Sequence, residues 1–328
     1  MNDHILTSQM LKEFADKLSA GGGGNGILGV APIERFNEAP ERMHPKNIFP
    51  DCKSVISIVQ PIPRSTYRGI TSGTYWPNYT YYSYNRLNTL FRPMVTYEVA
   101  RFIEDHGFEA VPVYPGVPEV YPDNPEPVAP GRPVPEININ VRIAAVACGL
   151  GEIGWSKVFI HKVFGPRVRI GTILTDAVLE PDALVEPGTL CNRCMACVRE
   201  CPGGCIPADK TKSITVNVAG KECTWGDIDV WRCNTFYTAG GKAYNPFVPA
   251  HVFDENADFL ESKVEMTPEN EVAAARAFEM YAPSWVGYAM AKCGGCIRGC
   301  ESVLEKVGCL EGKFKEPLRT GKPWKMDR

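Results

Sequence analysis

The sequence of 328 residues has little net charge, no long apolar run and no recognisable targeting signal. Its formal net charge of −3 gives no overall attraction to nucleic acid. No stretch approaches the roughly 18 apolar residues of a membrane-spanning helix. The first stretch, MNDHILTSQMLKEFADKL, lacks a basic region followed by an apolar run, and it lacks a twin-arginine pair. We therefore expect a cytoplasmic protein without a membrane span, in which thiols stay reduced.

Cysteine, by contrast, is abundant, with 13 residues in the chain. In a small secreted protein this number would indicate disulfide bonds, but this chain is neither small nor visibly secreted. Residues 191 to 205 read CNRCMACVRECPGGC, in which C-x2-C-x2-C-x3-C precedes a proline, and residues 293 to 300 read CGGCIRGC. The first spacing is typical of bacterial ferredoxins, in which the fourth cysteine binds a second [4Fe–4S] cluster. The two motifs together predict two [4Fe–4S] clusters.

The expected ligand sets combine the two motifs. The first set contains the early triplet and the last cysteine of the later motif, which are Cys191, Cys194, Cys197 and Cys300. The second set contains the fourth early cysteine and the other late ones, which are Cys201, Cys293 and Cys296. Its fourth ligand stays open among Cys205, Cys223 and Cys233. Structural zinc is the alternative, but one zinc needs only four ligands and leaves too many of these sulfurs unexplained.

The first 180 residues alternate between expected strands and helices, which favours an α/β layer. A helix capped by Thr7 or Ser8 comes first, and further helices are expected at 85–106, where Pro93 begins or kinks the helix, and at 141–150. The expected strands lie at 52–62, 108–115 and 168–179, and the proline-rich segment 111–137 predicts a long loop. After Cys205, ITVNVAG and ECTWGD predict a hairpin, and a last helix is expected from Thr267.

Three segments ahead of the cysteines resemble epoxyqueuosine reductases and reductive dehalogenases. They are HPKNIFPDCKSVISIV at 44–59, YTYYSYNRLN at 79–88, and GLGEIGWSKVFIHKVFGPRVRIGTILTDAVLEPD at 149–182. The resemblance implies a fold of the α+β or α/β class, with a nitroreductase-like α/β domain over residues 1–182. It also implies a ferredoxin-like domain over residues 183–328 that holds two [4Fe–4S] clusters and has an insertion between its cysteine motifs. The front domain would hold a corrinoid (cobalamin), whose cobalt the clusters reduce.

The resemblance also implies particular site residues. It selects Cys233, in DVWRC, as the missing cluster ligand. The aspartate that donates a proton in epoxyqueuosine reductases has no counterpart here, because an ungapped match falls on Pro135. The neighbouring Glu136 is therefore one candidate acid. The tyrosines of TYWPNYTYYSY are alternatives that the sequence does not separate, and Tyr81 and Tyr84 are taken as candidates among them.

Glycines and arginines near residue 160 are candidates for binding the cofactor. Three glycines could allow a flat ligand to approach the backbone or could simply form a helix end and a turn: Gly149, Gly151 and Gly154. Arg167 and Arg169 could bind corrinoid amides or a phosphate, or could form salt bridges on a strand. We expect the lone His161 to be structural. We also expect three isolated cysteines to be small buried hydrophobic residues: Cys52, Cys148 and Cys309.

These features favour a cytoplasmic iron–sulfur reductase that uses a corrinoid to cleave a small organic substrate reductively. Its partners would be that substrate and an external electron donor such as a ferredoxin or flavodoxin. The net charge of −3 and the short tail after Cys300 argue against a tRNA substrate. Two alternatives stay open: an electron-transfer protein that reduces a partner enzyme or its corrinoid, and a relative that has lost the corrinoid.

Overall fold

The computed structural model describes residues 5–18, 27–114, 126–135, 137–238, 240–255, 267, 294–310, 314–316, 318 and 325–327. The strands are β1 (Leu28–Pro32), β2 (Ser54–Pro61), β3 (Ala110–Val113), β4 (Gly151–Ile153), β5 (Phe159–His161), β6 (Val168–Thr175), β7 (Ser213–Val218) and β8 (Lys221–Gly226). The α-helices are α1 (Ser8–Leu18), α2 (Arg68–Ser72), α3 (Arg92–Asp105), α4 (Val141–Ala147), α5 (Ala196–Arg199), α6 (Val230–Thr238), α7 (Ala250–Glu255) and α10 (Gly295–Val307). Short 3-10 helices are η1 (Ile33–Phe36), η2 (Glu41–Met43), η3 (Pro45–Asn47), η4 (Arg64–Tyr67) and η7 (Lys242–Tyr244), and π-helical segments are η5 (Tyr79–Asn85) and η6 (Leu87–Phe91).

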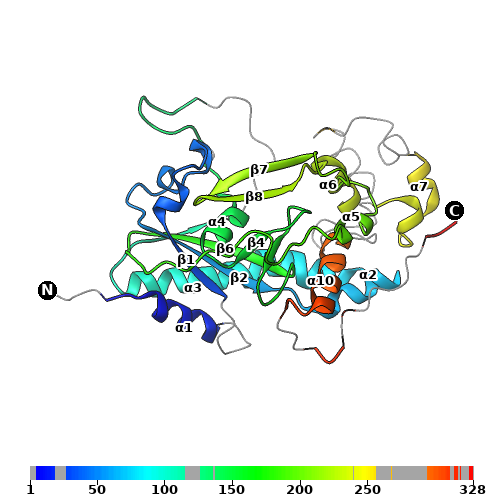
Figure 1. Cartoon of the computed structure of the whole chain (residues 1–328), viewed down its shortest axis with the longest axis horizontal. Helices are drawn as coiled ribbons and strands as arrows, with labels where there is room; N and C mark the ends of the chain where they lie inside the picture. Colours follow the sequence, from blue (N-terminus) through cyan, green and yellow to red (C-terminus); the bar gives the residue numbers. More distant parts are fainter. Residues whose placement is uncertain are drawn as a thin grey trace.

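An antiparallel sheet with strand order β1-β2-β6-β3 forms the centre of the fold. Helices α1 and α3 lie on one side of it and α4 on the other (Figure 1). Glycines allow these close approaches. A Cβ on Gly171 would lie 2.2 Å from Thr96 Oγ1 of α3, and a Cβ on Gly29 would lie 2.2 Å from the Cys148 carbonyl oxygen after α4. Strands β2 and β6 are therefore covered on both faces, which explains why nearly all of their residues are buried.

The expected mixture of strands and helices is confirmed, but the strand directions decide its class. The sheet pairs are all antiparallel among the described residues, so the fold is α+β and not a parallel α/β layer. A continuous apolar run indicates burial on both faces and carries no information about direction. The nitroreductase-like and ferredoxin-like descriptions, and the boundary after residue 182, stay predictions. The main core does include Val218, Cys223 and Trp225, which lie beyond that boundary.

Several local predictions are confirmed. Thr7 caps α1, because its Oγ1 accepts a hydrogen bond from the Met10 backbone N–H at 3.2 Å. The expected strands appear as β2, β3 and β6, and the helix at 141–150 appears as α4, followed by Gly149 with φ +70°. The hairpin appears as β7–β8, whose two-residue turn at Ala219 and Gly220 has positive φ at both positions, as type I′ turns require. The helix expected from Thr267 falls almost entirely outside the described residues.

The second expected helix begins earlier than the sequence suggests. Its first part, η5 and η6, is π-helical, and ordinary α-helix starts only at Arg92. Pro93 lies in the first turn of α3, where its missing N–H interrupts the regular hydrogen-bond ladder. Single π-helical turns are often found at functional sites, because they change the direction in which side chains point. The aromatic stretch predicted as a site thus has an irregular backbone.

No helix in the described part of the chain is long and apolar enough to cross a membrane.

Candidate functional site

Four cysteines of the first predicted ligand set lie together around α5 and α10. We call them the first thiolate group: Cys191, Cys194, Cys197 and Cys300. Burial, followed by the charges of Cys191, Cys197 and Cys194, raises the pKa of Cys300 well above its usual value. The charges of Cys191 and Cys194 likewise help burial to raise the pKa of Cys197 to about 11. Thiols that influence one another in this way would repel as thiolates unless a cation lay between them.

Glycines in the later cysteine motif bring the two helices together. A Cβ on Gly295 would lie 2.0 Å from the Glu200 carbonyl oxygen, and a Cβ on Gly299 would lie 3.1 Å from the Ala196 carbonyl oxygen. Helix α10 therefore packs directly on the α5 segment, as Figure 1 also shows. Between the early cysteines, Arg193 and Met195 have φ of 56° and 60°, which curls the loop tightly. The sequence CGGCIRGC thus serves packing as well as ligation.

A second thiolate group lies beside the first one. Its described members are Cys201, Cys205, Cys233 and Cys296. The Cys205 thiol hydrogen-bonds to both Cys201 and Cys233, which raises the pKa of Cys205, and the same contact lowers the pKa of Cys201 to about 6. Burial, then the charges of Cys233, Cys201 and Cys197, raises the pKa of Cys296 to about 12. The predicted ligand Cys293 lies outside the described residues.

Helix α10 serves both groups. Cys296 and Cys300 are four residues apart on it, so they lie one turn apart on the same face. Among the cysteines left open by the spacing, Cys205 and Cys233 both lie in the second group. Cys223 does not, because it lies on strand β8 and is buried in the main core. The assignment of eight cluster ligands stays a prediction. It gives no role to Cys205, although this thiol lies in the second group.

The two groups consist of cysteine side chains alone. Among the described residues, no three or more His, Cys, Asp or Glu side chains are arranged to hold a metal ion. Zinc ligands converge on one atom at about 2.0–2.3 Å. The thiolates of a four-iron cluster each bind a different iron atom, so they surround the cluster and do not converge on a point. The donor set is entirely sulfur, which fits such a cluster.

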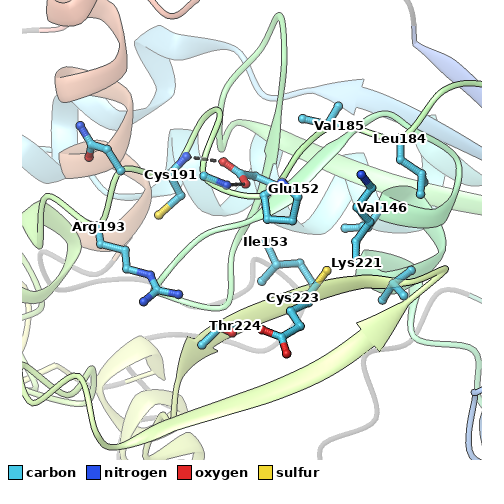
Figure 2. A pocket seen from close by; sticks show the side chains of 15 residues that line it. Val146, Glu152, Ile153, Leu184, Val185, Cys191, Arg193, Lys221, Cys223 and Thr224 are labelled. Carbon is cyan, nitrogen blue, oxygen red and sulfur yellow. Dashed lines mark hydrogen bonds between the residues drawn. The ribbon is translucent and has the colours of Figure 1, made fainter.

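A buried carboxylate that the sequence analysis missed supports the first group. Glu152 of β4 accepts hydrogen bonds from the backbone N–H groups of Gly188 at 2.6 Å, Leu190 at 2.5 Å, and Cys191. Figure 2 shows this carboxylate beside Cys191 in a cavity of about 320 Å³ that also contains Arg193 and Cys223. Glu152 therefore fixes the backbone at the start of the cysteine motif. Its signal in the sequence was a single acid within the apolar stretch GLGEIGW.

A much larger cavity of about 960 Å³ lies next to the second group. We call it the basic cavity, because its described lining includes Arg92, Arg142 and Arg169 and no Asp or Glu. Its aromatic lining residues are Tyr84, Tyr97, Tyr114 and Phe159. Ile297, the neighbour of Cys296 in the chain, forms part of its wall. Its volume is at the upper end of the range for small-molecule pockets, about 300–1,000 Å³.

The predicted site residues divide between this cavity and the interior. Tyr84 and Arg169 line the cavity, whereas Tyr81 does not and contacts Tyr82 and Arg86 instead. Arg167 is buried, with its Nε 2.5 Å from Glu301 Oε1 and its Nη1 2.6 Å from the Ile62 carbonyl oxygen. It therefore stabilises the fold beside α10. Glu136 lies outside the described residues, so its proposed part as a proton donor stays a prediction.

The three candidate glycines approach the chain itself. A Cβ on Gly149 would lie 2.2 Å from the Ala183 carbonyl oxygen, and one on Gly151 would lie 2.0 Å from the Ile160 carbonyl oxygen. Gly154 faces the Ile160 side chain in the same way. None of the three lines the basic cavity. This arrangement favours the alternative considered from the sequence, a helix end and a tight hairpin, over contact with a flat ligand.

The residues expected to be structural follow that expectation, with one exception. His161 is fully buried, and its Nδ1 accepts hydrogen bonds from the backbone N–H groups of Val163 and Phe164 at 3.1 and 3.3 Å. Cys52 and Cys148 are fully buried. The expectation for Cys309 is wrong, because this residue is exposed just after α10. It follows Gly308, the left-handed residue that ends the helix, so the chain there already leaves the core.

The curated proteins that the chain resembles in sequence are reductive dehalogenases. No family model matches the chain. The chain is similar to curated oxidoreductases that remove halogens reductively. Over 108 residues it is 31% identical to a tetrachloroethene reductive dehalogenase of Desulfitobacterium hafniense, and over 106 residues it is 34% identical to one of Dehalobacter restrictus. Each match covers 30% of this chain and only 19% of the relative's length.

Solved structures point to the same two families that the sequence motifs resemble. An epoxyqueuosine reductase from Bacillus subtilis aligns with a TM-score of 0.46 and 17% identity, covering 94% of this chain and 86% of that one. A catabolic reductive dehalogenase aligns with a TM-score of 0.44 and 15% identity, covering 85% and 35%. Likeness at this level carries no argument about function. The resemblance stated from the sequence is confirmed by the curated relatives, which are reductive dehalogenases.

Proposed function

We propose that the chain is an iron–sulfur oxidoreductase that reductively cleaves a small organic substrate in the basic cavity. The observation that carries this proposal is the contiguity of Cys296 and Ile297: one residue belongs to a thiolate group and the next forms the cavity wall. A site that transfers electrons needs its donor close to the substrate. Here the donor ligands and the largest described cavity share one helix, α10.

The thiolate groups would hold two [4Fe–4S] clusters, and the basic cavity would hold a corrinoid. The clusters supply single electrons at low potential, and the corrinoid supplies a strongly reducing and nucleophilic cobalt. The first group would bind one cluster through Cys191, Cys194, Cys197 and Cys300. The second group would bind the other through Cys201, Cys233, Cys293 and Cys296. Cys194 is exposed, so an external donor such as a ferredoxin or flavodoxin would dock near the first group.

Two buried residues, Trp155 and Ile206, shield part of the thiolate groups from water. Trp155 is 2% exposed, and its backbone N–H donates a hydrogen bond to Cys191 Sγ at 3.4 Å. Its indole N–H is satisfied by the Pro207 carbonyl oxygen at 2.8 Å, so the ring is fixed over the cysteines. Ile206 belongs to the same buried hydrophobic cluster of side chains as Trp155. Apolar surroundings and N–H···S hydrogen bonds are the main means by which a protein adjusts a cluster's potential.

Tyr84 is the best described candidate for holding the proton that the substrate takes up. It lines the basic cavity, and the Arg169 guanidinium carbon lies 5.8 Å from its ring centroid. A phenolic hydroxyl that lines the cavity can donate a proton to a bound substrate. Tyr81 is a weaker candidate because it does not line the cavity. A tRNA substrate is not proposed, given the net charge of −3.

Anaerobic reconstitution with iron and sulfide tests the proposal. We expect about eight iron atoms per chain and a comparable amount of acid-labile sulfide. The loaded protein, incubated with cobalamin and passed through a desalting column, should retain the corrinoid. Full iron content without cobalamin retention would favour the electron-transfer protein or the relative without a corrinoid. About one zinc per chain, with little iron, would overturn the cluster assignment itself.

A further inference from the structure

The basic cavity contains two neighbouring arginines. Arg92 and Arg169 both line it, and no Asp or Glu appears among its described lining residues. Burial, followed by the charge of Arg169, lowers the pKa of Arg92 to about 10, so the two guanidinium groups repel each other. A folded protein usually avoids placing two cations together in a partly buried site without an anion. The arrangement is therefore costly unless a ligand supplies the negative charge.

The hydrogen bonds of Arg92 leave donor capacity unused. Its Nη2 donates to the Asn88 carbonyl oxygen at 3.0 Å, and its Nη1 lies 3.4 Å from the Ile170 carbonyl oxygen. Its Nε is buried and has no hydrogen-bond partner among the described residues. A guanidinium carries five N–H donors in a planar fork that suits two oxygens of one anion. Arg92 is thus held in place by backbone oxygens while part of the fork is unsatisfied.

Arg169 is oriented by neutral groups in the same way. Its Nε donates to the Ser83 carbonyl oxygen at 3.1 Å, and its Nη2 lies 3.4 Å from the Tyr79 hydroxyl. Arg167, only two residues earlier, shows the contrast, because Glu301 neutralises it at 2.5 Å. Among the described residues, the arginine that serves packing is therefore paired with a carboxylate, and the one that lines the cavity has no carboxylate partner.

Aromatic residues surround the opening of this site. Tyr97 and Tyr114 line the cavity and are 53% and 87% exposed, which places them at its mouth. Tyr84 lies deeper, beside Arg169. Exposed tyrosine rings offer flat apolar surface to a planar ligand while their hydroxyls stay in water. The cavity thus combines a cationic interior with an aromatic entrance.

We propose that Arg92 and Arg169 form an oxyanion site, which binds a carboxylate or phosphate group of a ligand whose planar part packs on the cavity tyrosines. The inference rests on the proposed function for the importance of the cavity, and it adds the chemical class of ligand. The oxyanion has two sources: the carboxylate of an aromatic substrate, or the phosphodiester in the nucleotide loop of a cobalamin. Both present two oxygens to a guanidinium fork.

Calorimetric titration of the anaerobically reconstituted chain with benzoate and with inorganic phosphate tests the site. We expect binding that weakens as salt rises, and a loss of about tenfold or more in affinity in Arg92→Gln and in Arg169→Gln. Arg92→Lys, which keeps the charge but loses the fork, should weaken binding less than Arg92→Gln. The matched control is Arg132→Gln, since Arg132 is exposed and does not line the basic cavity. Unchanged affinity in both cavity variants, or an equal loss in the control, would overturn the proposal.

Retention of two corrinoids on a desalting column separates the two sources. Cobalamin contains the phosphodiester, and cobinamide lacks it. Weaker retention of cobalamin but not of cobinamide by Arg92→Gln identifies the corrinoid phosphate as the oxyanion. Unchanged retention of both, with lost benzoate binding, identifies a substrate carboxylate. If no corrinoid is retained by the parent protein but benzoate binding depends on both arginines, the oxyanion site stands and the corrinoid-dependent function fails. Iron content and circular dichroism establish that each variant is folded.

Discussion

The two thiolate groups share helix α10 but have different surroundings. The first group begins in a loop whose backbone is fixed by the buried carboxylate of Glu152, and its member Cys194 is exposed. The second group lies next to the basic cavity and contains one thiol, Cys205, that hydrogen-bonds to two others. One group thus faces the protein surface and the other faces the interior site.

This difference indicates how one short motif can connect a surface with a cavity. Helix α10 supplies one cysteine to each group. Because these two cysteines lie one turn apart, the two groups lie next to each other. The cavity beside the first group is lined by both carboxylates and cations, whereas the described lining of the basic cavity beside the second group contains arginines and no Asp or Glu. A negative charge disfavours a reduced, more negative cluster, and a positive charge favours it. The guanidinium groups of the basic cavity would therefore favour the reduced state of a cluster in the second group.

The largest expected effect comes from removing one ligand of either group. Cys300→Ser should lose the first cluster and Cys296→Ser the second, so iron should fall from about eight to about four atoms per chain in each. Iron analysis with electron paramagnetic resonance of the remaining cluster measures this. Cys223→Ser is the control, because Cys223 is buried in the main core outside both groups and should leave the iron content unchanged. Loss of all iron in either variant would mean that the groups do not act separately.

The second group contains one cysteine too many, so a pair of replacements tests its membership. Following the resemblance, Cys233→Ala should lose the second cluster, whereas Cys205→Ala should keep it and shift its potential. The shift is expected because the Cys205 thiol hydrogen-bonds to Cys201 and Cys233. Anaerobic reconstitution and redox titration distinguish the two. The reverse outcome, with iron lost only in the Cys205 variant, would assign the ligand to Cys205.

A smaller effect is expected at the carboxylate that supports the first group. Glu152→Gln keeps the size of the side chain but removes the charge from three backbone N–H donors. We expect a loss of about 1–3 kcal/mol in the free energy of unfolding and a higher potential for the first cluster, with the second cluster little changed. Glu222→Gln, an exposed residue lining the same small cavity, is the control. An equal shift in the reduction potentials of both clusters would mean that Glu152 does not act on the first group alone.

The features that were predicted correctly from the sequence depend on residues that are close together in the chain. The cap of α1 by Thr7, the buried strand β2 and the β7–β8 hairpin all follow from short patterns, and the structure contains each. The cysteine spacing likewise reflects local geometry, because residues four apart on a helix share a face. Strand direction did not follow, since a doubly covered antiparallel strand has the same apolar composition as a parallel one. The π-helical start before α3 has no comparable pattern.

Contacts between distant residues account for what the sequence did not reveal about the site. Glu152 supports a loop nearly forty residues later. Arg92 meets Arg169 only because α3 packs against β6 through Thr96 and Gly171. In the sequence, Arg167 and Arg169 were equivalent candidates. In the structure, Arg167 pairs with Glu301, whereas Arg169 lines the basic cavity. An arginine before a proline at a helix start, as in RPM, was the only local sign of Arg92.

Cysteines that lie outside both thiolate groups serve as internal controls for a labelling experiment. Burial raises the pKa of Cys52 to about 11 and that of Cys148 to about 12, so at pH 8 neither forms appreciable thiolate, whereas Cys309 is exposed. A raised thiol pKa means that reactivity should appear only as the pH approaches those values. In folded protein, iodoacetamide at pH 8 should therefore label Cys309 whether or not iron is loaded, and Cys52 and Cys148 in neither case. Peptide mass spectrometry should show that iron loading protects only the thiolate groups. Protection of Cys309 by iron would extend the metal site beyond them, and iron-independent labelling of Cys197 or Cys201 would exclude these residues as ligands.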